Sequence, residues 1–196
     1  MNFLLKTLTK SGIGGWVKAL VFLFLTTVLV GCGGYANDLS SSSENSDVVN
    51  AAQAEIEHAN QLNSKDTQCS DFVAAVLRRL GLQVPAFHAN DFDKIAAKYL
   101  PQWSMTEFTT EDLANGRASL RQYLNSFPDH TAFFAQWPRN GQSGHVAIVE
   151  KVSYDSYVIY QAQAGLSTPY KKAAKVESLL YGSVGVDRSK IRLWTE

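Results

Sequence analysis

The chain has 196 residues, of which 18 are basic and 18 are acidic, so its formal net charge is zero. Residues 1–31 contain three of the lysines and no acidic residue, which leaves 15 basic against 18 acidic residues, a net charge of about −3, in the remainder. This balance excludes a basic surface of the kind that binds nucleic acid. The last 149 or so residues are enough for one domain with its own apolar core.

The first 31 residues have the composition of a secretory signal peptide. Three lysines form a basic head, and an uninterrupted apolar run follows over residues 19–30. The alternative is a transmembrane helix, but the run has only about 12 residues, whereas roughly 20 are needed to cross a bilayer. The run ends in Leu-Val-Gly-Cys at residues 29–32, which resembles the lipobox of bacterial lipoproteins.

The lipobox resemblance implies cleavage before Cys32 and acylation of its thiol. The mature protein would then be anchored by lipid in the bacterial cell envelope. Gly33, rather than aspartate, follows the cysteine, which implies the outer membrane facing the periplasm if the host is Gram-negative. Residues 32–47 are polar and poor in aromatic side chains, which predicts a flexible tether that spans roughly 20 Å. The folded domain is predicted to occupy residues 48–196.

The best-defined helix is predicted to begin at Asp66 or Thr67 and to end at Gly81. Cys69 lies in its first turn and shares the inward face of the helix. Unpaired backbone N–H groups and the helix dipole favour an anion there, so the position predicts a lowered pKa for the thiol. The inward face is formed by apolar residues at helical spacing: Phe72, Val73, Val76, Leu77 and Leu80.

The remaining pattern changes from helix to strand along the chain. Further helices are predicted over residues 48–60, 91–100 and 109–124, the last one interrupted near residues 115–116. Strands are predicted over residues 131–136, 145–152, 157–161 and 191–194. Helices followed by a sheet indicate the α+β class.

A thiol and an imidazole are the groups that could carry chemistry. Cys69 begins a helix and His145 begins a strand, and a thiolate with a nearby histidine is the working part of cysteine hydrolases. Each residue also has a plain structural reading, as a buried packing cysteine and as a histidine at a strand edge. His130, just before the first strand, is the rival base. No spacing suggests a zinc site, and no metal or other cofactor is predicted.

Two stretches carry a family resemblance. QCSDFVAAVLRRLGLQVP (residues 68–85) and AFFAQWPRNGQSGHVAIVEKV (residues 132–152) resemble the cysteine helix and the histidine strands of the NlpC-type cell-wall peptidases and the related CHAP amidases. The resemblance implies a papain-like α+β fold in which the cysteine helix packs on an antiparallel sheet that bears the histidine. It also implies a peptidoglycan or muropeptide substrate, cleaved by a stem-peptide endopeptidase or an amidase.

The resemblance further implies a role for each site residue. Cys69 would be the nucleophile, His145 the general base and then the general acid, and Gln161 the residue that orients the imidazole, with Gln163 as its fallback. The backbone N–H of Cys69 is the natural donor to the oxyanion. A side-chain donor is sought in the segment that precedes the helix, at Asn63 or Gln61.

Two departures from the family pattern leave alternatives open. Asp71 stands where the family has glycine, which favours a catalytically degenerate binding or scaffold lipoprotein on the same fold as the second reading. A lipid or acyl-group transferase is the third. The segment over residues 100–125 is longer than is typical, and it is predicted to form either a lid or the docking site of a regulatory protein partner.

Overall fold

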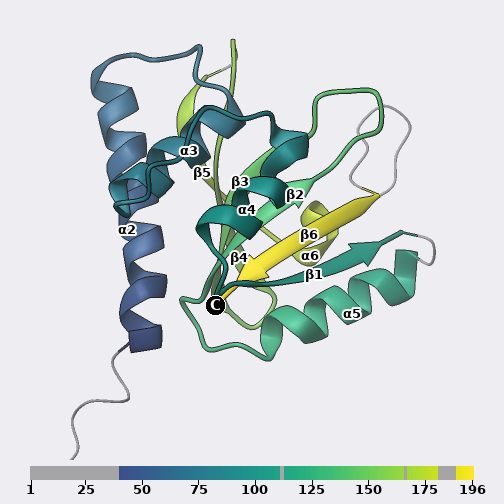
Figure 1. Ribbon diagram of the computed structural model, residues 1–196. Coiled ribbons are helices and arrows are strands. Elements are labelled where there is room, and N and C mark those ends of the chain that lie inside the picture. Colours follow the sequence, from purple (N-terminus) through teal and green to yellow (C-terminus); the bar gives the residue numbers. More distant parts are fainter. Residues whose placement is uncertain (1–39, 111–112, 166, 181–188) are drawn as a thin grey trace, which may run out of the picture. The chain divides into compact units, whose positions relative to one another are not determined.

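The computed structural model describes residues 40–110, 113–165, 167–180 and 189–196 (Figure 1). The predicted signal peptide, Cys32 and residues 33–39 of the predicted tether lie outside the described residues. Within the described ranges, no helix has both the length and the apolar character needed to cross a membrane.

The described strands form one antiparallel sheet in the order β1-β6-β2-β3-β4-β5. Helices precede most of the strands in the sequence, so the α+β prediction is confirmed. In chain order the elements are α2 (Ser40–Gln61), α3 (Cys69–Arg79), the 3₁₀ turn η1 (Ala89–Asp91), α4 (Phe92–Tyr99), β1 (Ser104–Thr109), α5 (Leu113–Asn125), β2 (Ala132–Trp137), β3 (His145–Ser153), β4 (Ser156–Gln163), β5 (Ser167–Ala174), α6 (Val176–Leu179) and β6 (Lys190–Thr195).

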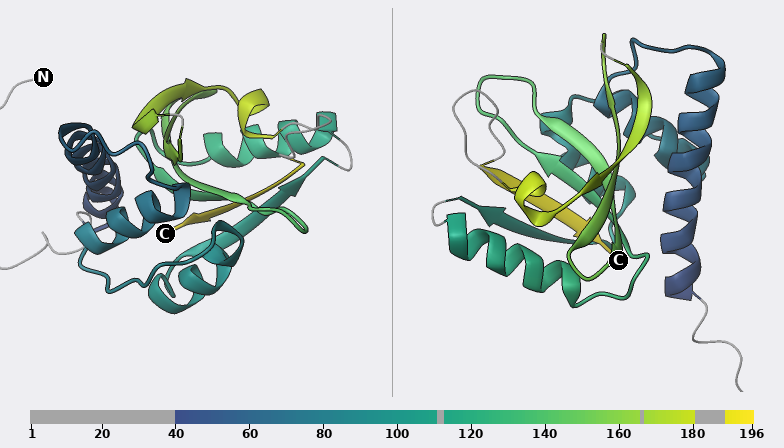
Figure 2. Two further views of the ribbon diagram at one scale, coloured as in Figure 1. Left: turned by 90° about the horizontal axis from the view of Figure 1, so that it is seen from above. Right: turned by 180° about the vertical axis from the view of Figure 1, so that it is seen from behind.

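Helices cover both faces of the sheet. Helices α2, α3 and α4 lie on one face, and α5 and α6 lie on the other (Figure 2). Strand β3 runs between β2 and β4, and its side chains alternate between the two cores. Val146 and Ile148 join the core beneath α3, whereas Ala147 and Val149 join the core beneath α5. This explains why β3 is apolar on both faces, as its sequence predicted.

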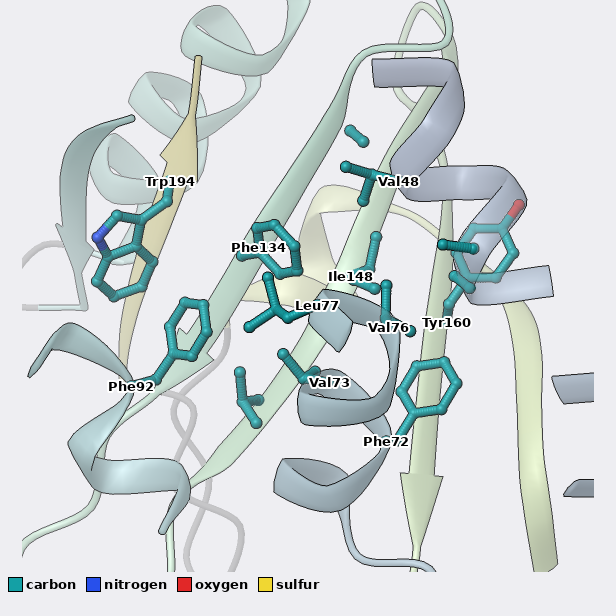
Figure 3. Close-up of a cluster of buried hydrophobic side chains, with 14 of the residues drawn as sticks. Val48, Phe72, Val73, Val76, Leu77, Phe92, Phe134, Ile148, Tyr160 and Trp194 are labelled. Carbon is teal, nitrogen blue, oxygen red and sulfur yellow. The ribbon is translucent and has the colours of Figure 1, made fainter. Parts of the chain in front are cut away.

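The core on the first face fixes the cysteine helix to the sheet. The apolar inward side chains of α3, those of Phe72, Val73, Val76 and Leu77, are fully buried, and they pack between α2 and the strands β2, β3 and β4 (Figure 3). Burial of each such side chain contributes about 1.5–3 kcal/mol. The side chains of this contact include Phe72, Val73, Val76 and Leu77 from the helix and Phe134, Ile148 and Tyr160 from the sheet.

The first two helix starts differ from the prediction. Helix α2 begins at Ser40, so residues 40–47 of the predicted tether continue the helix that was expected from residue 48. Val48 and Val49 are buried against the core, and a helix held there extends at low cost because each further residue adds one hydrogen bond. Helix α3 begins after Gln68 rather than after Asp66 or Thr67, because the Thr67 hydroxyl bonds back to Ser64 instead.

Two edge strands were not predicted from the sequence. Strand β1 forms one edge of the sheet and pairs only with β6, while β5 forms the other edge and pairs with β4. Edge strands tolerate proline, lysine and exposed polar residues, so they lack the apolar alternation by which strands are recognised. The sequences SMTEFT of β1 and STPYKKAA of β5 have this character.

The long segment over residues 100–125 completes the sheet and the second core. Its first part is the edge strand β1, and its second part is α5, which is a single helix through Gly116 rather than two. Leu120 and Leu124 of α5 are fully buried in the second core with Phe133. The segment is therefore a structural part of the domain, and the lid that was one of its two predicted roles is not seen.

Gly116 lies where α5 crosses β1, and we expect its replacement by alanine to destabilise the fold. A Cβ atom there would overlap the carbonyl oxygen of Thr109 and come within 3.3 Å of a Leu180 methyl group. Alanine favours an exposed helix by about 1 kcal/mol over glycine, but we expect Gly116→Ala to lower the free energy of unfolding by about 1–3 kcal/mol. Chemical denaturation measures the change. Ser119→Ala, at an exposed position of the same helix, is the neutral control, and a Gly116→Ala protein as stable as the wild type would contradict the argument.

Candidate active site

Cys69 is the first residue of α3 and is half-buried at the point where that helix meets the sheet. Its backbone position follows from the helix start, since the N–H of Phe72 donates to the carbonyl of Gln68 at 3.0 Å. The side chain packs against the first core, as its position on the inward face predicted. Within the part of the chain that the structure describes, Cys69 is a free thiol.

Burial raises the pKa of the Cys69 thiol above its ordinary value. The backbone N–H groups of Val146, Ser70 and Cys69 itself act in the opposite direction, and Asp71 adds a small upward contribution to the pKa. The prediction of a lowered pKa is therefore wrong: the helix N-terminus has the expected effect, but loss of solvent around the sulfur outweighs it. Because Val146 acts on the sulfur, the thiol lies against the start of β3, one residue from His145.

His145 and Gln161 are joined by a hydrogen bond between neighbouring strands. His145 is the first residue of β3, and its Nε2 lies 2.8 Å from Oε1 of Gln161 on β4. The imidazole also lies against the indole of Trp137, with 5.4 Å between ring centroids. Trp137 is held in turn by its indole N–H, which donates to the carbonyl of Leu179 at 2.7 Å. One face of the imidazole thus packs against Trp137, and its Nε2 is hydrogen-bonded to Gln161.

Tyr170 of β5 fixes the orientation of the Gln161 amide. Nε2 of Gln161 donates to the hydroxyl oxygen of Tyr170 at 3.0 Å. The amide nitrogen is used by Tyr170, so the amide oxygen faces His145 and accepts a hydrogen bond from a protonated Nε2. The register between β4 and β5 shifts between Gln161 and Gln163, and such bulges redirect side chains beside functional sites. Gln163, the predicted fallback, is exposed beyond this shift.

These residues line one cavity of about 440 Å³. Cys69 packs against the core beneath α3. His145 lies on the same face of β3 as Ala147 and Val149, which belong to the opposite core. Both residues line the cavity because it lies at the strand ends, where β3 begins. The lining consists of Gln68, Cys69, Arg139, Ser143, Gly144, His145, Gln161, Ala162, Gln163, Ala164, Tyr170 and Lys172.

The Asn90 side chain clamps the loop that leads into His145. Its Nδ2 donates to the carbonyls of Arg139 and Gln142 at 3.0 and 2.7 Å, and its Oδ1 accepts the N–H of Arg139 at 3.0 Å. Gly144 is required beneath this clamp, because a Cβ atom there would overlap Oδ1 of Asn90 and lie 2.9 Å from the Trp137 carbonyl oxygen. The clamp therefore fixes the backbone immediately before the histidine.

Several residues singled out in the sequence lie elsewhere. His130 bonds through Nδ1 to Glu150 at 2.8 Å, at the end of β2 away from Trp137 and the cavity, so it is not a base for Cys69. Asn63 and Gln61 are exposed and do not line the cavity, whereas Gln68, which was not predicted, does. Asp71 is exposed and also lies off the cavity lining, so it does not obstruct the entrance.

Three other lining or supporting residues were not singled out in the sequence. Arg139 stands in the turn before His145, and that adjacency was the available signal. Lys172 lies on β5, the unpredicted edge strand, and Asn90 lies in the 3₁₀ turn η1. Nothing local in the sequence marks these two. In the part of the chain that the structure describes, no group of three or more His, Cys, Asp or Glu side chains is arranged to hold a metal ion.

Comparison with known proteins identifies one family. The family model described as CHAP domain matches residues 59–164, which is more than half of the chain. The matched stretch includes Cys69, His145 and Gln161 and ends before β5. No curated protein and no solved structure matches the chain significantly.

We expect the Cys69 thiol to be a slow nucleophile toward small alkylating reagents at neutral pH. Only the thiolate reacts, and a raised pKa means that a smaller fraction of Cys69 is ionised at a given pH than of an ordinary thiol. The iodoacetamide rate, followed by mass spectrometry of the peptide that contains Cys69, is expected to reach its midpoint at higher pH than that of a free thiol in the same solution. A midpoint below that of the free thiol would show that the anion-stabilising N–H groups dominate.

Proposed function

The chain belongs to the CHAP domain family, and from this premise we propose that it is a lipid-anchored cysteine hydrolase that cleaves an amide bond in peptidoglycan. CHAP domains have a papain-like fold, and membership of the family supports an amidase or peptidase function on peptidoglycan. The finer part of the proposal concerns the residues that act, the bond class and the membrane anchor.

One observation carries the catalytic assignment. Cys69, His145 and Gln161 line the same cavity, and the histidine is hydrogen-bonded to the glutamine at 2.8 Å. A nucleophile, a base and a group that orients the base are the three parts of a cysteine hydrolase site. With Nε2 of His145 bonded to Gln161, Nδ1 is the nitrogen that would receive the thiol proton.

The reaction proceeds from a neutral thiol. As the sulfur of Cys69 attacks the amide carbonyl carbon, His145 takes the thiol proton, and the C=O bond pair moves onto oxygen. The backbone N–H of Cys69 donates to this oxyanion, and we assign the role of second donor to the side chain of Gln68, because it lines the same cavity. When the tetrahedral species collapses, the C–N bond breaks and His145 protonates the leaving amine.

Water completes the cycle. His145 takes a proton from a water molecule, whose oxygen attacks the thioester formed on Cys69, and it returns that proton to the departing sulfur. Throughout, Gln161 accepts the hydrogen bond of the Nε2–H and so keeps the ring in one tautomer. An amide carries no net charge, so Gln161 stabilises the imidazolium through its dipole and does not neutralise it.

The proposed location rests on the N-terminal sequence. The basic head, the short apolar run and the Leu-Val-Gly-Cys ending at Cys32 support acylation of that cysteine. A lipid-anchored protein outside the cytoplasm is held in the compartment that contains peptidoglycan. The two cysteines would then have separate tasks, one as anchor and one as nucleophile.

This division of tasks predicts opposite outcomes for the two cysteines. Cys69→Ala is expected to lower the release of soluble fragments from purified peptidoglycan by at least about a thousandfold, because no nucleophile remains, and to leave the protein in the membrane fraction. Cys32→Ser is expected to keep the hydrolytic activity in a detergent extract but to lose incorporation of labelled palmitate. Fragment release is measured by chromatography and mass spectrometry.

His130→Gln serves as the matched control for His145→Gln, since only the second histidine lines the cavity. Full activity in Cys69→Ala would refute the assignment of Cys69 as the nucleophile. Palmitate labelling that persists in Cys32→Ser would refute Cys32 as the site of acylation. Peptide fragments that bind to the wild-type chain without turnover would favour the binding or scaffold reading instead.

We expect Tyr170→Phe to lower kcat about two- to tenfold, which corresponds to one hydrogen bond of about 0.5–1.5 kcal/mol, while KM changes less. Without the hydroxyl acceptor, the Gln161 amide is free to turn its nitrogen toward His145 and to stabilise the wrong tautomer. Tyr154→Phe removes a hydroxyl from an exposed tyrosine and is the control. An unchanged kcat in Tyr170→Phe would show that Gln161 does not need this partner.

A further inference from the structure

We propose that Arg139 and Lys172 form a carboxylate-binding subsite beside Cys69, which selects peptidoglycan peptides that carry a free carboxylate near the scissile amide. The inference rests on the proposed function and names the substrate class of that same cavity. Both cations line the cavity that contains Cys69 and His145, and among the residues that the structure describes no aspartate or glutamate lines it.

The Arg139 guanidinium has no partner among the described residues. Its Nε is buried without a hydrogen bond, and no ion pair engages the side chain. The other arginines in the described ranges differ in this respect. Each of them donates to a carboxylate or a backbone carbonyl: Arg78, Arg79, Arg117, Arg121 and Arg192. Arg139 lines the cavity, and a guanidinium without a protein partner there can donate to a ligand acceptor.

The Arg139 backbone is already held in place. Asn90 accepts its N–H and donates to its carbonyl, both at 3.0 Å, so the residue is bonded on both sides of its Cα while its side chain has no partner in the described part. A guanidinium presents parallel donors that match the two oxygens of a carboxylate. Because the backbone does not need to be ordered on binding, less conformational entropy is lost when a ligand arrives.

Lys172 supplies a second charge to the same cavity. It lies on β5 two residues after Tyr170, and residues at this spacing share one face of a strand. Lys171 alternates to the other face and does not line the cavity. No hydrogen bond or ion pair engages the side chain of either lysine within the described ranges. Substitution of Lys172 or of Lys171 therefore distinguishes the effect of a cation that lines the cavity from that of a cation on the adjacent residue.

The chemistry of the proposed substrate fits these charges. Peptidoglycan stems contain a glutamate that is linked through its side chain, so its α-carboxylate is free beside an amide bond. Two cations in a partly enclosed cavity would favour this anion over the neutral carboxamide of the same size. Arg139 lies within the stretch that matches the family model, whereas Lys172 and Tyr170 lie on β5, after that stretch ends. The proposed subsite therefore combines one residue from the matched stretch with one from a strand outside it.

The test compares two peptides that differ at one group. Binding of L-Ala-γ-D-Glu-L-Lys with a free α-carboxylate, and of the same peptide as its α-carboxamide, is measured by calorimetry on the full chain with Cys69→Ala. We expect at least about a tenfold preference for the carboxylate, the size of one charge-assisted hydrogen bond. Arg139→Gln is expected to reduce the preference to less than about twofold, Lys172→Gln to reduce it in part, and Lys171→Gln to leave it unchanged.

Hydrolysis of both peptides by the wild-type chain keeps the two proposals apart. If the carboxylate preference is found but neither peptide is cleaved, the subsite stands and the peptidase function fails. Equal binding or equal cleavage of the two peptides overturns the subsite and leaves the hydrolase standing. A preference for the carboxylate that persists in both Arg139→Gln and Lys172→Gln has the same consequence. Failure of both peptides to bind also overturns the subsite. Thermal unfolding of each variant shows whether a lost preference reflects a lost fold.

Discussion

The packing of α3 on the sheet is the contact on which the site depends. Cys69 and His145 are far apart in the sequence. Cys69 packs against the core beneath α3, whereas His145 lies on the face of β3 that carries Ala147 and Val149 of the opposite core, and both residues line the cavity. Their separation is therefore fixed by how the helix lies along β3. Phe72, Val73 and Leu77 are fully buried in that contact, and a displacement by one helical turn, about 5.4 Å, would remove them from it. The same burial that stabilises the domain thus sets the distance between the thiol and the imidazole.

That packing also determines the chemical state of the thiol. The helix N-terminus and the Val146 N–H favour a thiolate, but the packed core around the sulfur disfavours any charge, and burial is the larger effect on the pKa. A thiol that rests in its neutral form needs its base at the moment of attack. The polar chain from His145 through Gln161 to Tyr170 is suited to this task because it orients the imidazole without a carboxylate that would keep it protonated.

Sequence analysis predicted the elements that carry an apolar pattern and missed those that do not. The spacing of Phe72, Val73 and Leu77 predicted α3 and the inward face of Cys69, and the unbroken apolar run of β3 predicted a central strand. Strands β1 and β5 lie at the edges, where side chains meet solvent and the pattern disappears. Helix α5 runs through Gly116 because the glycine allows close approach to Thr109, a contact that no local rule contains.

The same division holds within the site. Cys69, His145 and Gln161 were predicted because they stand at recognisable positions in motifs and at element starts. The pKa of the thiol was predicted with the wrong sign, because helix position is visible in a sequence and burial is not. Asn90 acts through hydrogen bonds to a loop far away in the chain, and Tyr170 acts through a hydrogen bond to the neighbouring strand β4. Such partners become apparent only when the loop at 138–144 and the edge strand β5 are in place.

The charges of the cavity link substrate binding to the proton transfer. Arg139 and Lys172 face the same cavity as His145, and like charges nearby disfavour the imidazolium that must form when the thiol loses its proton. A substrate carboxylate between the two cations would cancel this repulsion, so the imidazolium would form more readily with a charged substrate bound than without one. Part of the energy of binding the carboxylate would then stabilise the transition state. The preference for a charged substrate would therefore affect kcat as well as KM. The neutral Gln161 makes the site sensitive to this effect, because a carboxylate in its position would already stabilise the cation.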